Sequence, residues 1–255
     1  MKETFLSGAE FDLPLYEHKL RGAYIICSTP RSGSTLLCAL LKNTGVMGVP
    51  HEYFHLTEHA QILWKRLVPD AKSEITIVEY FNAMVRHRTS ENGIFGLKAH
   101  INQCFPYYQN GFMSHFFGDI KHVAIRRRDT LGQAISSVIA SQTGKWTSEE
   151  KASKAAEFAP ELIEGALTTI LYQNHLWQHF FQLNAIQPCV CYYEDLLENP
   201  SNEIQRILDF VGVESNIPVD IEKAGIRKEA TQLNEDWRRR FNAAFKMPRR
   251  NSSGQ

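Results

Sequence analysis

AYIICSTPRSGSTLL, residues 23–37, begins with the pattern of a β-strand and ends with the pattern of a helix. Its first five residues are apolar and are followed by a loop of small residues, which is typical of a buried strand that ends at a turn. Beyond the loop, Leu36, Leu37, Leu40 and Leu41 recur on one helical face, and Gly45 supplies a stop signal. The stretch therefore predicts a strand, a short loop and a helix.

The loop between this strand and this helix suits an anion. Free backbone N–H groups and the positive end of the helix dipole point at whatever lies before a helix N-terminus. Gly33 lets the backbone come close to a ligand, and Arg31 adds a charge-assisted donor. The second glycine and the lysine of GxxxxGK[ST] are missing, which argues against a nucleoside triphosphatase. The plain alternative is an ordinary capped turn with a stray arginine.

Three further apolar runs extend the pattern into a sheet, at residues 94–99, 122–125 and 189–193. Helix signals follow the third and fourth strands directly: Asp129 can cap one helix, and Asn199-Pro200 opens another. Short strands that alternate with longer helical stretches predict an α/β fold with a central parallel sheet flanked by helices. Such folds bind ligands at the edge where their strands end.

The length of 255 residues suits one sizeable core, and we expect residues 1–255 to form a single domain. Residues 1–21 form a leader of unknown role, and residues 247–255 resemble a disordered tail. Because 28 basic residues balance 28 acidic ones, no overall positive field attracts nucleic acid or a membrane surface. The five cysteines are odd in number and lack CxxC spacing, which indicates reduced thiols. No signal peptide or transmembrane stretch stands out, so we expect a cytoplasmic protein.

At this point a family resemblance becomes specific. STPRSGSTLL, residues 28–37, resembles the 5′-phosphosulfate loop of sulfotransferases that use 3′-phosphoadenosine-5′-phosphosulfate (PAPS), in the variant with Arg31 where many members carry lysine. TGVMGVPHEYF, residues 44–54, is similar to the segment that follows this loop in the trehalose 2-sulfotransferase family. The resemblance implies a P-loop-like sulfotransferase fold, PAPS as co-substrate without a metal, a trehalose-like sugar or glycolipid as acceptor, and a homodimer.

The resemblance also implies how the donor is held. Arg31 would be catalytic, because it neutralises the charge that builds on the bridging oxygen of PAPS. Arg127, at the end of a strand, and Ser136, on the next helix, would bind the 3′-phosphate. Arg128 is the alternative to Arg127, because it also gives a permitted spacing. The donor-binding residues expected in this way are Arg31, Ser32, Gly33, Ser34, Thr35, Arg127, Ser136, Arg227 and Lys228. For the last two, an amphipathic helix over residues 233–245 that packs on the core is the plain explanation.

By the same resemblance, Glu52 is the general base that takes the proton from the acceptor hydroxyl as its oxygen attacks sulfur in line. The residues expected to bind the acceptor are His51, Glu52, Tyr53, Phe54, Lys98 and Trp146. For the two aromatics that follow Glu52, simple core packing is at least an equal alternative. YEDL, residues 193–196, matches a segment widespread in sulfotransferases, and we expect its carboxylates to cap the next helix.

Two other functions stay open from the sequence alone. HEYFH, residues 51–55, satisfies the HExxH pattern of zinc metallohydrolases, in which two histidines one helical turn apart bind the metal. That chemistry needs a regular helix, whereas Pro50 places the motif at a loop exit. The second alternative is a non-catalytic protein that binds a nucleotide.

Overall fold

The structure, a computed structural model, describes residues 8–55, 58–68, 76–146, 150–214 and 232–245. Two compact units emerge: one from residues 1–128 and 172–226, the other from residues 129–171 and 227–255. That the chain forms one domain stays a prediction, and the expected tail at residues 247–255 lies outside the described residues.

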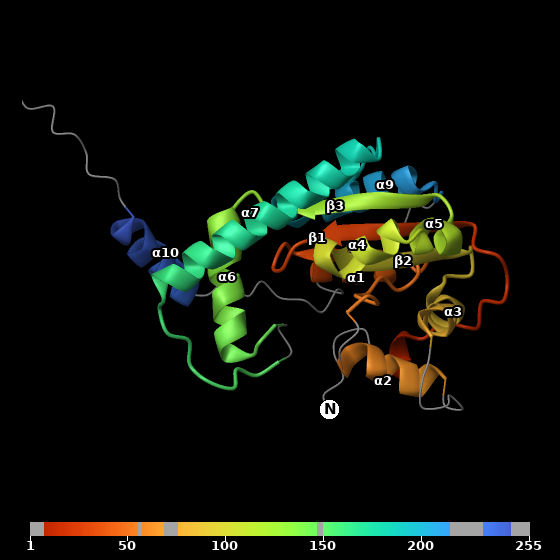
Figure 1. The fold of residues 1–255 in the computed structure, drawn as a ribbon, viewed down its shortest axis with the longest axis horizontal. Helices are drawn as coiled ribbons and strands as arrows, with labels where there is room; N and C mark the ends of the chain where they lie inside the picture. The colour runs from red at the N-terminus through yellow and green to blue at the C-terminus, as the bar shows by residue number, and fades with distance from the viewer. Residues whose placement is uncertain (1–7, 56–57, 69–75, 147–149, 215–231, 246–255) are drawn as a thin grey trace, which may run out of the picture. The chain divides into compact units, whose positions relative to one another are not determined.

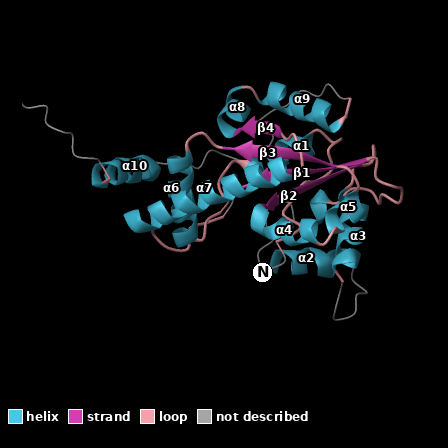
Figure 2. Cartoon of the chain, turned by 45° about the horizontal axis from the view of Figure 1, so that its top comes forward, coloured by secondary structure: helices cyan, strands magenta, loops and turns pink. Residues whose placement is uncertain are grey.

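The first unit is built on a four-stranded parallel sheet, shown from two directions in Figures 1 and 2. The strands are β1 (Gly22–Ser28), β2 (Ile94–His100), β3 (Ile120–Arg126) and β4 (Cys189–Tyr192), in the order β2-β1-β3-β4. Each of the four apolar runs is therefore confirmed as a strand, and every neighbouring pair is parallel. The α/β fold predicted from the sequence is confirmed.

Helices cover both faces of this sheet. They are η1 (Ala9–Phe11), α1 (Ser34–Asn43), α2 (Glu58–Leu67), α3 (Ile77–Arg88), α4 (Ile101–Gln109), α5 (Phe112–Phe117), α8 (Tyr193–Glu198), α9 (Pro200–Val211) and the C-terminal part of α7 (Pro160–Leu183). Because strand residues alternate between faces, Ile25 joins an aromatic-rich core with α3, α4, α5 and α7, while Tyr24 and Ile26 join an aliphatic core with α1 and α9.

The ends of α9 follow the expected chemistry. The Asn199 side chain accepts a hydrogen bond from the backbone N–H of Asn202, and α9 stops at Gly212 in the left-handed conformation. By contrast, α4 begins directly after β2, where the sequence indicated no helix. Its first turn is held by Gln103, whose side-chain oxygen accepts from the backbone N–H of His100 at 2.8 Å.

The second unit consists of α6 (Thr130–Thr143), the N-terminal part of α7 and α10 (Gln232–Ala244). Asp129 caps α6 as predicted, since its carboxylate accepts from the backbone N–H of Gly132 at 2.9 Å. The same carboxylate binds the Arg238 guanidinium at 2.5 Å, which ties α10 to the start of α6. The predicted helix is confirmed, and Trp237 and Phe241 are buried against α6 and α7, whereas Leu233 and Phe245 at its two ends are exposed.

None of the helices in the described ranges has both the length and the apolar character needed to cross a bilayer.

The described part of the leader is a strap that ties α2 and α3 together. Asp12 forms ion pairs with Arg66 of α2 and with Arg88 of α3, whose Nη2 lies 2.9 Å from Asp12 Oδ1. The Arg88 side chain is fully buried, and this carboxylate compensates its charge there. Backbone bonds from Leu13 to the His87 carbonyl and from Arg21 to the Gly93 carbonyl continue the strap to the start of the sheet.

Replacing Asp12 with alanine should lower the free energy of unfolding by about 3 kcal/mol, because Arg88 would keep a buried charge without its carboxylate. Urea denaturation of the variant measures this loss. The matched control is Glu17→Ala, since Glu17 pairs with Arg86 at 2.6 Å where both side chains are exposed. That change should cost under about 1 kcal/mol. Equal losses of unfolding free energy in the two variants would show that the buried ion pair stabilises the fold no more than the exposed one.

Candidate active site

The loop between β1 and α1 has the geometry of an anion cradle. It leaves the sheet at Ser28, and α1 begins at Ser34, so the first helical N–H groups face the loop. Arg31 and Gly33 both have positive φ, at 60° and 89°. The predicted order of strand, loop and helix is confirmed, and Ser32, Gly33, Ser34 and Thr35 lie where the sequence placed them.

One residue of this loop indicates a ligand. Ser32 is fully buried, and its hydroxyl makes no hydrogen bond to any group in the described part of the chain. An unpaired buried hydroxyl is unfavourable unless a ligand or water supplies the partner. The neighbouring Gly33 is explained by packing, because an added Cβ would lie 2.3 Å from a ring carbon of Tyr193. The Ser32 hydroxyl is therefore the group of the loop that a bound anion would satisfy.

Glu52 lies beside the carboxyl end of β2. The backbone N–H of Lys98 donates to the His51 carbonyl at 2.9 Å, which places residues 51–52 against the strand. Lys98 Nζ is 2.5 Å from Glu52 Oε1, and the Gln103 side-chain amide donates to Glu52 Oε2 at 3.1 Å. Lys98 is buried, whereas a strand-end lysine is usually exposed. The structure thus brings together the predicted base and a cation whose partner the sequence had not indicated.

Burial and ion pairing act in opposite directions on these two groups. Burial alone would raise the pKa of the Glu52 carboxyl, but Lys98, His100 and Gln103 together hold that pKa well below its usual range. Burial alone would likewise lower the pKa of Lys98, and the Glu52 carboxylate outweighs it and raises that pKa. Both groups are therefore charged across the physiological pH range.

His100 is a site residue that the sequence reasoning missed. Its Nε2 lies 4.0 Å from Glu52 Oε2, and its Nδ1 lies 3.1 Å from both the hydroxyl and the carbonyl oxygen of Ser28. Burial lowers the pKa of His100, which favours the neutral ring. The available signal was its spacing of two from Lys98, because alternate strand residues face the same side. His100 therefore links the end of β1 to the Glu52 carboxylate.

Tyr53 and Phe54 lie in the aromatic core rather than on an open surface. They are 0% and 3% exposed, and the Tyr53 hydroxyl donates to the Val49 carbonyl at 2.5 Å. Tyr53 stacks on Phe95, and Phe54 packs on Phe81. The structure shows the core packing that was the alternative for both rings, and their contact with an acceptor stays a prediction. His51 is half-buried, with its ring edge against Tyr53.

The HEYFH segment does not form the helix that a zinc hydrolase motif requires. Residue 51 forms an isolated bridge to Leu97, and residues 53–54 form a turn. The two histidines therefore do not share one helical face. Among the described residues, no group of three or more histidine, cysteine, aspartate or glutamate side chains is arranged to hold a metal ion.

The arginines after β3 differ in their surroundings. Arg128 makes two bonds to the Asp195 carboxylate, at 2.6 and 2.7 Å, and its backbone N–H donates to Glu194. The expectation that these two carboxylates cap the next helix is wrong, because they bind Arg128 and Asn199 supplies the cap. Arg127 instead lies over the Tyr193 ring at 5.1 Å.

Tyr193 thereby touches both Gly33 of the loop and Arg127, which brings Arg127 close to the anion cradle. Ser136 and Trp146 belong to the second unit, so their roles stay predictions. Arg227 and Lys228 lie outside the described residues.

Replacing Lys98 with methionine should raise the pKa of Glu52 from its depressed position, because burial would remain while the largest opposing charge is lost. NMR titration of carbon-13-labelled glutamate carboxyls measures this. Lys121→Met is the matched control, since Lys121 pairs with the exposed Asp119 at 3.6 Å and should leave Glu52 unchanged. An unaltered Glu52 titration in the Lys98 variant would show that the ion pair does not form in solution.

Known proteins resemble this chain. The chain is similar to the trehalose 2-sulfotransferases of Mycobacterium tuberculosis and Mycolicibacterium smegmatis, each 24% identical over 86% of this chain and 94% of the relative. Among solved structures, it resembles a sulfotransferase domain of the curacin biosynthetic pathway at 14% identity and a TM-score of 0.49, over 91% of this chain and all of that one. A model of the Stf0 sulphotransferase family matches residues 23–244, a span from β1 to the end of α10, and the chain therefore belongs to that family.

Proposed function

We propose that this protein transfers the sulfuryl group of PAPS to a hydroxyl of a carbohydrate acceptor, with Glu52 as general base. The main observation in support of the proposal is that the loop after β1 and the Glu52 carboxylate lie at the same edge of the sheet. His100 contacts Ser28, where the anion loop begins, and also faces the Glu52 carboxylate. An anion cradle and a proton acceptor are thus side by side, as group transfer to a hydroxyl requires.

The loop fits the 5′-phosphosulfate end of such a donor. PAPS supplies a sulfuryl group that is attached to a good leaving group, adenosine 3′,5′-bisphosphate. The Ser32 hydroxyl and the first N–H groups of α1 would bind its phosphate oxygens, and Arg31 would offset negative charge at the bridging oxygen. The 3′-phosphate would fall to Arg127, because Asp195 already holds the Arg128 guanidinium in two bonds. That Ser136, Arg227 and Lys228 also bind the donor is inferred from the sequence resemblance alone.

Glu52 is prepared for its role by its neighbours. The carboxylate is ionised in the resting protein, so it can accept a proton from an acceptor hydroxyl without first losing one. Lys98 weakens it as a base while the two remain paired. When an anionic sulfuryl group enters the site, it competes with Glu52 for the Lys98 ammonium group and so releases the basicity of the carboxylate. Lys98 then has two roles: it holds Glu52 ionised before the donor binds, and it stabilises negative charge on the sulfuryl oxygens afterwards.

The acceptor class rests on the relatives. Both curated relatives are trehalose 2-sulfotransferases, which supports a trehalose-like sugar or a glycolipid as the acceptor. The cytoplasmic location and the homodimer expected from the sequence stay predictions.

Adenosine 3′,5′-bisphosphate should bind metal-free protein more tightly than AMP or ATP, as measured by calorimetry. Arg127→Ala should weaken it by about ten-fold or more, the worth of a hydrogen bond to a charged group, and leave AMP affinity unchanged. Arg128→Ala should weaken it less, because that arginine is bound to Asp195. Absence of binding would overturn the PAPS proposal, and an equal loss of AMP affinity would show that Arg127 does not contact the 3′-phosphate.

Replacing Glu52 with glutamine should lower the turnover number roughly 100-fold to 10,000-fold, the usual range for a lost general base. The affinity for adenosine 3′,5′-bisphosphate should change little, because Glu52 does not contact it. Turnover with PAPS and trehalose gives the first quantity and calorimetry the second, with Glu91→Gln as the exposed control. An active Glu52→Gln variant beside an inactive His100→Phe variant would move the base to His100. Equal loss of turnover and affinity would contradict a specific role for Glu52.

A further inference from the structure

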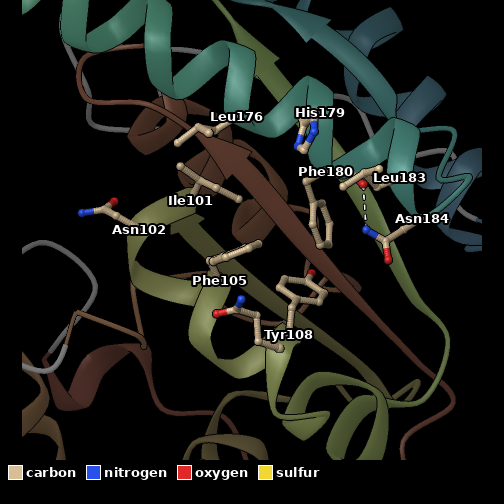
Figure 3. A pocket seen from close by; sticks show the side chains of 10 residues that line it. Ile101, Asn102, Phe105, Tyr108, Leu176, His179, Phe180, Leu183 and Asn184 are labelled. Carbon is tan, nitrogen blue, oxygen red and sulfur yellow. Dashed lines mark hydrogen bonds between the residues drawn. The ribbon is translucent and has the colours of Figure 1, made fainter.

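A groove of about 340 Å³ lies between α4 and the C-terminal part of α7, within the first unit (Figure 3). Each helix contributes residues spaced three or four apart, which form one continuous stripe on its surface. The apolar members of the two stripes are Ile101, Phe105 and Tyr108 on α4, and Leu176, Phe180 and Leu183 on α7. The volume falls in the range of small-molecule sites, which are mostly apolar with a few polar groups.

The groove has a buried floor and exposed apolar walls. Ile101 and Phe180 are 3% and 6% exposed, and they form part of the aromatic core. Tyr108 directs its hydroxyl to His122 Nε2 at 2.8 Å, so its polar end is already satisfied. Phe105 and Leu183 are 41% and 72% exposed, which is unfavourable for large apolar side chains in water. An occupant that covers them would recover apolar burial.

The lining also selects against charged ligands. Among the described residues that line it, none is an aspartate, glutamate, lysine or arginine. The polar members are amides and one histidine, of which Asn102 and His179 are exposed at the rim. Without a formal ion partner, an anion or cation would lose hydration and gain little in return. The chemistry of the groove therefore fits an uncharged alkyl or acyl chain.

One end of the groove is formed by residues that adjoin the candidate active site in the sequence. Ile101 directly follows His100, and the same first turn of α4 carries Gln103, which binds Glu52. On the other helix, Leu176 precedes Trp177, whose indole N–H donates to the Ser28 carbonyl at 3.1 Å. Both walls therefore start beside residues that contact the end of β1 or the predicted base.

A polar feature marks this same end. Pro106 lies inside α4 and has no N–H, so the usual helical bond to the Asn102 carbonyl cannot form. The side chain of Asn102 is exposed at the groove. Polar groups near the base, with apolar surface leading away from it, match a molecule that has a hydroxylated head and an apolar tail.

We propose that this groove binds the alkyl or acyl chain of an amphiphilic acceptor, whose sugar hydroxyl is presented to Glu52. The proposal rests on the proposed function and narrows its acceptor from carbohydrates in general to acylated or alkylated sugars. The chain lies along the α4 and α7 stripes and covers Phe105 and Leu183.

The test compares trehalose with 6-O-butanoyl and 6-O-octanoyl trehalose, at concentrations below micelle formation. The kcat/KM with PAPS should rise with chain length and reach about ten-fold or more for the octanoyl ester, since each buried methylene contributes up to about a four-fold gain. Calorimetric binding of the octanoyl ester should also show a negative heat-capacity change that trehalose lacks. Phe105→Gln and Leu183→Gln should each lower the ratio of octanoyl to trehalose kcat/KM at least three-fold.

The matched control is Leu15→Gln, an exposed leucine of the same unit that does not line the groove, and it should leave the ratio unchanged. Equal kcat/KM across the three acceptors would overturn the groove proposal and leave the proposed function standing. A chain-length effect that survives both groove variants, or that Leu15→Gln lowers equally, would also overturn it. Absence of turnover on every acceptor would count against the proposed function. The calorimetric signal and its loss in Leu183→Gln would then still decide the groove.

Discussion

The parallel register of β1 with β2 is the constraint on which the rest of the site depends. It pairs Ser28 with His100 and Ile26 with Lys98, so the two strands finish at the same level. Because the carboxyl ends of parallel strands meet at one edge, the loop after β1 lies beside the polar side chains at the end of β2. Alternation along β2 then turns Lys98 and His100 to one side while Leu97 and Ala99 enter the core. The sheet itself therefore brings the loop after β1 close to the candidate base beside β2.

Buried charge holds the segments that lack regular structure. Lys98 on a strand fixes Glu52 just before a turn, and Arg88 on a helix fixes Asp12 in the N-terminal strap. In each pair the regular element supplies the cation, and burial makes that cation costly unless the carboxylate stays in place. The irregular segment therefore gains a defined position without backbone ladders of its own. A buried ion pair thus fixes the strap in one case, and in the other it lowers the pKa of the candidate base.

Much of this architecture could be predicted because its signals are local. The apolar runs indicated all four strands, and the Asn199-Pro200 signal marked the start of α9. The features that escaped prediction depend on contacts distant in the sequence. Lys98 is buried because Glu52 meets it, and Arg128 is distinguished from Arg127 only by its bonds to Asp195. The helix after β2 was missed because Pro106 argues against a helix interior, and its first turn is capped by His100 and Gln103 rather than by a serine or an aspartate.

The contact between Gly33 and Tyr193 has a consequence for how such proteins can diverge. The space that a side chain at position 33 would need is already filled by the Tyr193 ring, which also carries Arg127 on its face. A larger residue at position 33 would require the Tyr193 ring to move, and such a shift would disturb the support of the arginine. Positions 33, 127 and 193 are therefore coupled through one ring, and covariation between positions 33 and 193 should be visible among natural relatives.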